Sequence, residues 1–417
     1  MAPLRIGIAL LTNESGGGAY QYGQTMLSVL AELRDERKEE FVVLADELRA
    51  GDPLLGGVEW EIAPLTSGSL RRRAFRVAKQ LAPDRHRHRW REQRGGPTGA
   101  ARRRPDIRAW HERLGIDLVV YPFTSPFAFE AGTPYVLAVH DLMHRRHPEF
   151  PEFSGSELAE REYLFGSGIE EAELILVDSE VGKEDVLEFY ADRITPDRIA
   201  VLPFLPGAPT AVTDDDRARV RRDHRLPERF LFYPAQFWPH KNHRLIVEAL
   251  AHVEDAELVL VGSAVGEVRE RNHAELFTRA RELGLERRLH HLGYVPAADV
   301  AALYSEAVAL VMPTFFGPTN IPVLEAWALD CPVITSDIRG VREQAGDAAL
   351  LVDPESLEAL TEAIRRVWLD EELRAELARR GRERLALYTR DEYGRRLGAV
   401  LDQAGALVCQ SPESARV

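Results

Sequence analysis

The sequence has 417 residues, of which 45% are hydrophobic and 29% are charged, a composition typical of a soluble globular protein. Its 53 lysines and arginines are outnumbered by 67 aspartates and glutamates, and the net charge of −14 excludes duplex nucleic acid as a general partner. Apolar runs fall short of the roughly 18 residues that cross a bilayer, and the apolar start is too short for an export signal. Cys331 and Cys409 are too few for a disulfide framework or a thiolate metal cluster. We therefore expect a cytoplasmic protein of roughly two to three domains.

Short apolar, β-branched runs alternate with amphipathic stretches along the chain, which is the pattern of parallel sheets covered by helices on both faces. The first set of expected strands comprises residues 5–11, 41–45, 116–122, 135–140, 173–178 and 198–202. The second set comprises residues 230–233, 257–261, 289–292, 307–312, 332–335 and 349–352. The sequence therefore predicts two successive doubly wound α/β units.

A stretch without apolar periodicity, LPGAPTAVTDDD at residues 205–216, separates the two sets and indicates a domain boundary. We expect a first domain at 1–205, a linker at 206–224, a second domain at 225–385, and a C-terminal helix and tail at 386–417. Whether that helix packs back on the first domain stays open. Ligands of doubly wound folds bind outside the carboxyl ends of the strands. We therefore expect the site in a cleft between the two domains.

A glycine-rich loop follows the first expected strand and leads into a helix. It reads NESGGGAY from Asn13 to Tyr20 and contains Gly17 and Gly18. Glycines allow close approach of the backbone, and a helix N-terminus favours an anion, so a phosphate is a candidate ligand. The spacing matches neither a dinucleotide-binding fingerprint nor a Walker loop. A plain strand-to-helix turn is the alternative.

His140 ends the expected strand YVLAVHDL and begins the pattern H-D-x-x-H-x-x-H, which continues to His144 and His147. Such spacing suggests a divalent metal, but a strand end that runs into a loop does not fix its ligands on one face as a helix does. We therefore favour a histidine at the interdomain surface over a metal ligand. A structural histidine with a satisfied hydrogen bond is the remaining alternative.

The second set of strands opens with FLFYPAQFWPHKNHRLIVEAL, in which Lys241 precedes an amphipathic helix expected to start at Asn242. A lysine beside free amides and the positive end of a helix suits a diphosphate, although a solvated loop lysine is the alternative. Further on, LVMPTFFGPTNIPVLEAWALDCPVITSD predicts a buried strand, a loop, and a helix starting near Pro322 with Glu325 in its first turn. That glutamate is either a ligand-binding group or a helix-capping partner.

Taken in chain order, the glycine-rich loop, V-H-D-L, P-x-x-x-K-N, I-P-V-L-E-A and C-P-V-I-T-S-D resemble the family-4, or group 1, glycosyltransferases. The resemblance extends from about residue 5 to residue 401. It implies a GT-B fold of two Rossmann-like domains that face a cleft, with the acceptor bound by the first and a nucleotide sugar by the second. It also implies retention of the anomeric configuration, no required metal and no cofactor other than the nucleoside diphosphate sugar, with the choice of UDP or GDP open.

The resemblance also assigns roles to individual residues. It places Gly17 and Gly18 against the donor phosphates, His140 near the donor sugar, Lys241 on the diphosphate and Glu325 on the ribose. Two positions depart from the family pattern, because Gly317 stands for the first of two paired glutamates and Gln236 stands for an arginine. The chain thus resembles a variant with GPTN in the loop. We expect the backbone amides of Thr319, Asn320 and Ile321 to replace part of the lost contact.

These residues favour a retaining, metal-independent glycosyltransferase in polysaccharide biosynthesis. It would move a hexose-type sugar to a glycan, a lipid-linked or a small-molecule acceptor, with His140, Lys241 and Glu325 as its catalytic groups. Two alternatives stay open: a nucleotide-sugar 2-epimerase, and a catalytically silent nucleotide-sugar-binding partner.

Residues 71–108 form a strongly basic segment, with 14 lysines and arginines against Asp84, Glu92 and Asp106. Arginines attract anionic lipid headgroups. The segment therefore predicts either peripheral docking at the inner face of a membrane or an ordinary solvated surface.

Overall fold

The computed structural model describes residues 3–10, 18–46, 48, 52, 55–66, 103–153, 156–206 and 211–410. The chain divides into two compact units. The first comprises Met1–Arg145, Gly155–Pro203 and Arg390–Val417, and the second comprises Arg146–Ser154 and Phe204–Thr389. The last helix of the chain thus belongs to the first unit, and the short segment at Arg146–Ser154 belongs to the second.

The first unit is built on a seven-stranded parallel sheet in the order β3-β2-β1-β4-β5-β6-β7. Its strands are β1 (Arg5–Ala9), β2 (Glu40–Leu44), β3 (Glu61–Ala63), β4 (Leu118–Tyr121), β5 (Tyr135–Ala138), β6 (Leu174–Val177) and β7 (Ile199–Val201). The central strands β4, β5 and β6 are buried at every position, because helices cover both faces.

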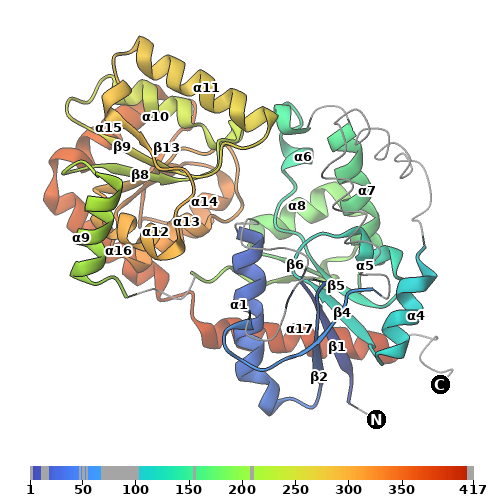
Figure 1. The fold of residues 1–417 in the computed structure, drawn as a ribbon. Helices are drawn as coiled ribbons and strands as arrows, with labels where there is room; N and C mark the ends of the chain where they lie inside the picture. The colour runs from blue at the N-terminus through green and yellow to red at the C-terminus, as the bar shows by residue number, and fades with distance from the viewer. Residues whose placement is uncertain are drawn as a thin grey trace. The chain divides into compact units, whose positions relative to one another are not determined.

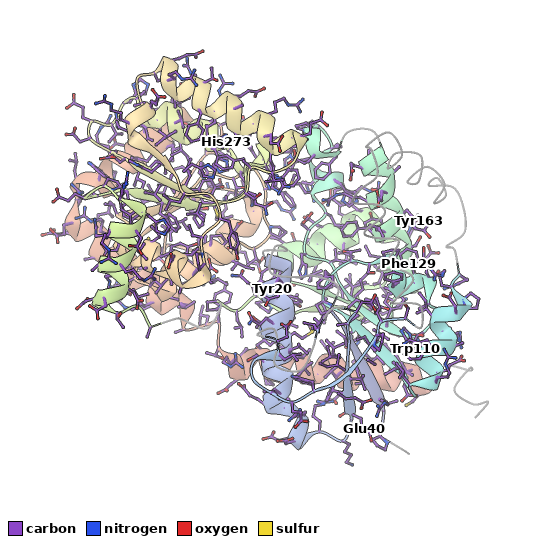
Figure 2. All side chains as sticks on the ribbon, in the orientation of Figure 1. Tyr20, Glu40, Trp110, Phe129, Tyr163 and His273 are labelled. Atoms are coloured by element: carbon purple, nitrogen blue, oxygen red, sulfur yellow. The ribbon has the colours of Figure 1, made fainter. Side chains whose placement is uncertain are left out.

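Helices of the first unit include α1 (Gly18–Leu33), α4 (Pro105–Arg113), α5 (Pro126–Glu130), α6 (Met143–Arg146), α7 (Ser156–Glu171), α8 (Glu180–Tyr190) and α17 (Arg390–Gln410). Helices α1 and α17 pack on one another, as Figure 1 shows. Helix α5 packs on α7, where the rings of Phe129 and Tyr163 meet edge to face with centroids 5.2 Å apart (Figure 2). Such aromatic pairs add to the burial that holds the two helices together.

The second unit has a six-stranded parallel sheet in the order β10-β9-β8-β11-β12-β13. The strands are β8 (Leu231–Pro234), β9 (Leu258–Val261), β10 (Leu289–His291), β11 (Ala309–Met312), β12 (Val333–Ser336) and β13 (Leu350–Val352). Since β8 and β11 are neighbours, the loops that follow them leave the same edge of the sheet side by side.

Figure 1 shows helices on both faces of this second sheet, with α10, α11 and α15 on one face and α9, α12 and α13 on the other. The helices are α9 (Asp214–His224), α10 (His243–Leu250), α11 (Glu267–Glu282), α12 (Ala297–Glu306), α13 (Ile321–Ala328), α14 (Arg339–Ala345), α15 (Leu357–Leu369) and α16 (Glu371–Leu385). No helix in the described part of the chain is long and apolar enough to span a membrane.

Two elements differ from the sequence expectation. Strand β3 was not expected, because its three residues, Glu61–Ala63, form an edge strand too short for an apolar run. Helix α9 occupies the second half of the expected linker at 206–224 and belongs to the second unit. It buries only Val220, so it has no apolar stripe, and it begins with a capping box between Thr213 and Asp216.

Candidate functional site

His140 lies two residues beyond β5, at the carboxyl edge of the first sheet. Its Nε2 lies 2.7 Å from the carbonyl oxygen of Pro122, which follows the neighbouring strand β4, so this nitrogen carries the proton and donates. The ring of Tyr22, on α1, packs edge to face against it with centroids 4.6 Å apart. Burial lowers the pKa of His140, so the imidazole is neutral at pH 7. A neutral histidine with a fixed tautomer is therefore held at this edge.

The other histidines of the H-D-x-x-H-x-x-H pattern have separate structural surroundings. His144 is fully buried, stacks on Phe165 and lies 3.0 Å from Glu162. His147 belongs to the second unit. Among the described residues there is no cluster of three or more histidine, cysteine or acidic side chains that could hold a metal. The three histidines of the pattern thus have different surroundings in the described structure.

Part of the predicted site falls outside the described residues. Gly17 and the rest of the loop at 11–17 lie there, while Gly18 is exposed and is the first residue of α1. Residues 67–102, most of the basic segment, also lie there. At its described end, Arg103 pairs with Glu171 at 2.7 Å and Arg108 pairs with Glu112 at 3.1 Å.

Lys241 is the last residue of a short 3₁₀ helix, η6 (Pro239–Lys241), in the loop after β8. Helix α10 begins at His243 rather than at Asn242, because Asn242 adopts the left-handed conformation with φ 57°. The buried amide of Asn242 donates to the carbonyls of Pro313, at 3.0 Å, and Pro354, at 2.8 Å. Because asparagine tolerates this conformation, the side chain can fix the backbone directly behind the half-buried lysine.

The loops after β8 and β11 are joined by hydrogen bonds. The backbone N–H of Phe315 donates to the carbonyl of His240 at 2.8 Å, in addition to the bond from Asn242 to Pro313. Lys241 and the Gly317 loop therefore belong to one connected surface at the carboxyl edge of the second sheet.

A segment from before helix α7 supports this surface from within the second unit. Glu152, in the 3₁₀ helix η4 (Pro151–Phe153), accepts a hydrogen bond from Nδ1 of His240 at 2.6 Å. Phe150 packs against the rings of Phe315 and His240 at 5.8 and 6.2 Å. The residue before Lys241 is thus held by its side chain as well as by its carbonyl.

Gly317 and Asn320 shape the loop after β11. Gly317 has φ 153°, and a Cβ there would lie 2.6 Å from Oδ1 of Asn320, so only glycine fits. Asn320 is 5% exposed, and its backbone N–H donates to Oε1 of Gln344 at 2.9 Å while its carbonyl accepts from Nε2 of the same side chain. The Asn320 amide is thus bonded to Gln344 in this structure, and its contact with the donor stays a prediction. The Thr319 and Ile321 amides stay a prediction.

Glu325 lies on α13, but not in its first turn as expected. The helix begins at Ile321, with Asn320 as the residue before it, so Glu325 is one turn further along. Its carboxylate accepts a hydrogen bond of 3.0 Å from the buried hydroxyl of Tyr304, on α12. Burial, together with the Glu325 charge, raises the pKa of Tyr304 far above its usual value, so the hydroxyl keeps its proton and donates.

Gln236 is likewise engaged by neighbours. Its Oε1 accepts from Nε1 of Trp238 at 3.0 Å and from Nη1 of Arg269 at 2.8 Å. Close behind this loop, His243 stacks on Phe237, and burial lowers the pKa of His243 to about 3, so it adds no charge at neutral pH. At this edge of the sheet, the half-buried cation of Lys241 can bind an anion, and the carboxylate of Glu325 can accept hydrogen bonds from hydroxyls.

Several residues of this edge were missed by sequence reasoning: Glu152, Arg269, Tyr304 and Gln344. Each contacts a site residue that lies 21 to 88 positions away in the chain. Hydropathy periodicity reports which face of an element is buried but not which elements meet. Gln344 is a buried polar residue, which is unusual and would have marked it as a candidate. The sequence alone does not show that it is buried.

Residues 214–384 match the family model described as "Glycosyl transferases group 1". Most of the second unit is therefore similar to the group 1 glycosyltransferases. The predicted enzyme class, glycosyltransferase, and the GT-B class of fold, with two Rossmann-like units, are confirmed. The expected position of the ligand between the units stays a prediction.

Two curated relatives are about a quarter identical to this chain over the aligned residues. The O-antigen chain mannosyltransferase B of Escherichia coli is 24% identical over 66% of this chain and 72% of its own length. The D-inositol 3-phosphate glycosyltransferase of Corynebacterium glutamicum is 26% identical over 58% of this chain, and the match spans only 59% of that relative.

Solved glycosyltransferase structures share its fold. The Anabaena protein HepE in complex with UDP-glucose aligns with a TM-score of 0.70 and 17% identity, covering 96% of this chain and 99% of that one. WaaG, a glycosyltransferase involved in lipopolysaccharide biosynthesis, aligns with a TM-score of 0.63 and 17% identity, covering 95% and 98%. At this identity the likeness shows the architecture.

Proposed function

We propose that the protein is a retaining, metal-independent glycosyltransferase that moves a hexose-type sugar from a nucleoside diphosphate sugar to an acceptor hydroxyl. The observation that carries the proposal is the joined pair of loops in the second unit, with Lys241 on one side and, one turn into the following helix, Glu325 on the other. The names of the relatives, a mannosyltransferase and a D-inositol 3-phosphate glycosyltransferase, and the UDP-glucose complex of HepE support a sugar nucleotide as donor.

The second unit would hold the donor. Lys241 would contact the diphosphate, because a cation fixed by a rigid loop stabilises phosphate oxygens. Glu325, oriented by Tyr304, would accept hydrogen bonds from the ribose hydroxyls. The amides of Thr319 and Ile321 would contribute at the sugar end, where Gly317 leaves room.

In the reaction, the bond between the anomeric carbon and the diphosphate oxygen breaks as the acceptor oxygen bonds to that carbon from the same face. The acceptor proton passes to the departing phosphate oxygen. Lys241 stabilises the charge that builds on the leaving group, an interaction that strengthens towards the transition state. In the first unit His140 would lie near the donor sugar as a neutral hydrogen-bonding group, since its Nε2–H is directed to Pro122.

The acceptor would be a glycan, a lipid-linked or a small-molecule hydroxyl bound by the first unit, as in polysaccharide biosynthesis. For a lipid-linked acceptor, the protein would be cytoplasmic and would contact the membrane peripherally through residues 71–108. Sedimentation with anionic liposomes at low and high salt tests this contact, which should disappear at high salt.

Titration calorimetry with UDP- and GDP-linked hexoses, followed by turnover assays with and without EDTA, tests the function. We expect one donor to bind, to be consumed, and to be consumed equally in EDTA. Binding without turnover would identify a silent binding protein. Conversion of the donor sugar to its 2-epimer would identify an epimerase. Loss of activity in EDTA that returns with a divalent metal would contradict the metal-independent reaction.

A further inference from the structure

Arg269 brings a second cation to the loop that carries Lys241. It lies in the first turn of α11, yet its side chain contacts the loop after β8. Its Nη1 donates to Oε1 of Gln236 at 2.8 Å, and its guanidinium carbon lies 4.7 Å above the ring of Trp238. Trp238 in turn donates to the same Gln236 oxygen, so the amide and the ring fix the guanidinium from two sides.

The backbone is shaped to allow this approach. Gly262, just after β9, has φ 149°, and a Cβ there would lie 2.4 Å from the carbonyl oxygen of Ala235 and 2.9 Å from the backbone nitrogen of Gln236. Asn272, one turn after Arg269, donates to the carbonyl of Phe237 at 2.9 Å. Figure 2 marks the neighbouring His273 on the same helix, and its ring packs against Phe237 at 4.7 Å. Helix α11 is thus tied to this loop along two turns.

The charge of Arg269 is not neutralised by a carboxylate. Within the described part of the chain no acidic side chain forms an ion pair with it, and its hydrogen-bond partner is a neutral amide. Arg279, further along the same helix, shows the usual arrangement, with Glu248 at 2.7 Å and Glu282 at 3.0 Å. A cation in the first turn also faces the positive end of the helix dipole, which is unfavourable. Arg269 is thus a half-buried cation that is fixed in position but not neutralised, at the edge of the sheet where a ligand is expected. Such a cation favours an anionic ligand.

We propose that Arg269 is a second cation of the donor-diphosphate subsite, supplied by α11 and oriented by Gln236 and Trp238. This proposal rests on the proposed function and adds a binding residue to it. A planar guanidinium can donate two parallel hydrogen bonds to phosphate oxygens, which the ammonium of Lys241 cannot do. The arginine that the family resemblance places at position 236 is therefore replaced by one from a different element, with Gln236 as its support.

The test compares Arg269→Gln with Arg271→Gln. Arg271 lies on the same helix and is exposed, so its substitution removes the same charge away from the loop. Calorimetry with UDP, GDP, uridine and guanosine separates the phosphates from the nucleoside. Losing hydrogen bonds from a charged group should weaken diphosphate binding roughly 10- to 100-fold in Arg269→Gln. Nucleoside affinity and the unfolding temperature should stay as in the wild type, and Arg271→Gln should bind like the wild type.

A rescue variant distinguishes charge from packing. The double substitution Gln236→Arg with Arg269→Gln returns a cation from the loop side, and we expect it to recover most of the lost diphosphate affinity. Diphosphate binding by Arg269→Gln equal to that of Arg271→Gln would overturn the proposal, as would an equal loss of nucleoside and diphosphate affinity. If the wild-type protein binds neither UDP nor GDP, the proposed function itself fails, which is a separate result from a wild type that binds and a variant that is unchanged.

Discussion

Helix α9 and the loop after β8 both belong to the second unit, but different interactions hold them. The loop is fixed by buried groups, chiefly the neutral amide of Asn242 on two carbonyls, with the carboxylate of Glu152 on His240 beside it. Helix α9 is held on α12 by charged pairs, with Asp299 accepting from Arg219 at 2.7 Å and lying 3.0 Å from His224. Neutral buried bonds are insensitive to salt and to moderate pH, whereas charged surface pairs depend on both. The contrast suggests that the candidate site is the rigid part of the unit and that its first helix is the adjustable part.

The largest expected effect comes from the charge that the rigid loop carries. Lys241→Ala should lower turnover roughly 10²- to 10³-fold, the scale for losing one group that stabilises charge in the transition state. The unfolding temperature should be unchanged, because the lysine is half-buried and the loop is held by its neighbours. Steady-state kinetics with the identified donor measures this, and turnover within threefold of the wild type would remove Lys241 from the site.

Asn242→Ala tests the rigidity of the loop itself. It leaves two buried carbonyls without their donor and forces alanine into a left-handed conformation, so we expect a loss of about 2–4 kcal/mol in the free energy of unfolding. Asn242→Gly is the matched control, because glycine accepts that conformation but cannot donate the two hydrogen bonds. Denaturant unfolding of both variants separates the backbone strain from the loss of the two hydrogen bonds. A glycine variant as stable as the wild type would mean that the two hydrogen bonds contribute little.

The orientation of Glu325 by Tyr304 should have a smaller effect. Tyr304→Phe removes only the hydroxyl, and we expect the KM for the donor to rise roughly tenfold with kcat little changed, as for a contact present in ground and transition states alike. Glu325→Ala should raise the KM at least as much. Tyr135→Phe, which removes a buried hydroxyl bonded to Gly168 in the first unit, is the control and should leave the KM unchanged. Donor affinity of Tyr304→Phe equal to that of the control would refute the positioning role.

The charged contact of α9 should have the smallest effect and the clearest pH dependence. The hydrogen bond from Arg219 lowers the pKa of Asp299 against the opposing effect of burial, and His224 lowers it further. A carboxyl with a depressed pKa in the folded state stabilises the fold above its unfolded pKa, near 3.9, and this contribution is lost as pH falls through the folded pKa. Asp299→Asn should therefore be less stable than the wild type at pH 7, with the difference vanishing in acid.

Asp223→Asn, at an exposed pair with Arg222 on the same helix, is the matched control and should change stability little at any pH. Unfolding curves of both variants and the wild type at several pH values measure this difference in stability. A deficit in Asp299→Asn that persists at pH 2 would mean that the aspartate acts through packing rather than charge.

Sequence reasoning located elements whose signal is local. The strand preceding Lys241 and the strand before the Gly317 loop were placed to within two residues, because buried parallel strands are continuous apolar runs. Strand β3 and helix α9 were missed, since an edge strand of three residues and a helix docked by charges carry no such run.

The positions of His140, Lys241 and Glu325 at strand ends and near helix starts were also accessible from sequence, whereas their partners were not. The clamp of Gln344 on Asn320 and the contact of Arg269 with Gln236 join residues 24 and 33 positions apart. Only the folded sheet, which places the ends of β8, β9 and β11 along one edge, brings such groups together.

The most direct test of the central claim is the anomeric configuration of the first-formed product, followed by proton NMR from an α-linked donor. Water can serve as the acceptor before the natural one is known, because in the proposed mechanism it would attack the anomeric carbon from the face that the diphosphate leaves. We expect the first signal to be that of the α-anomer, before mutarotation, with release of the nucleoside diphosphate. A first-formed β-anomer would contradict the same-face mechanism derived from Lys241 and the leaving phosphate.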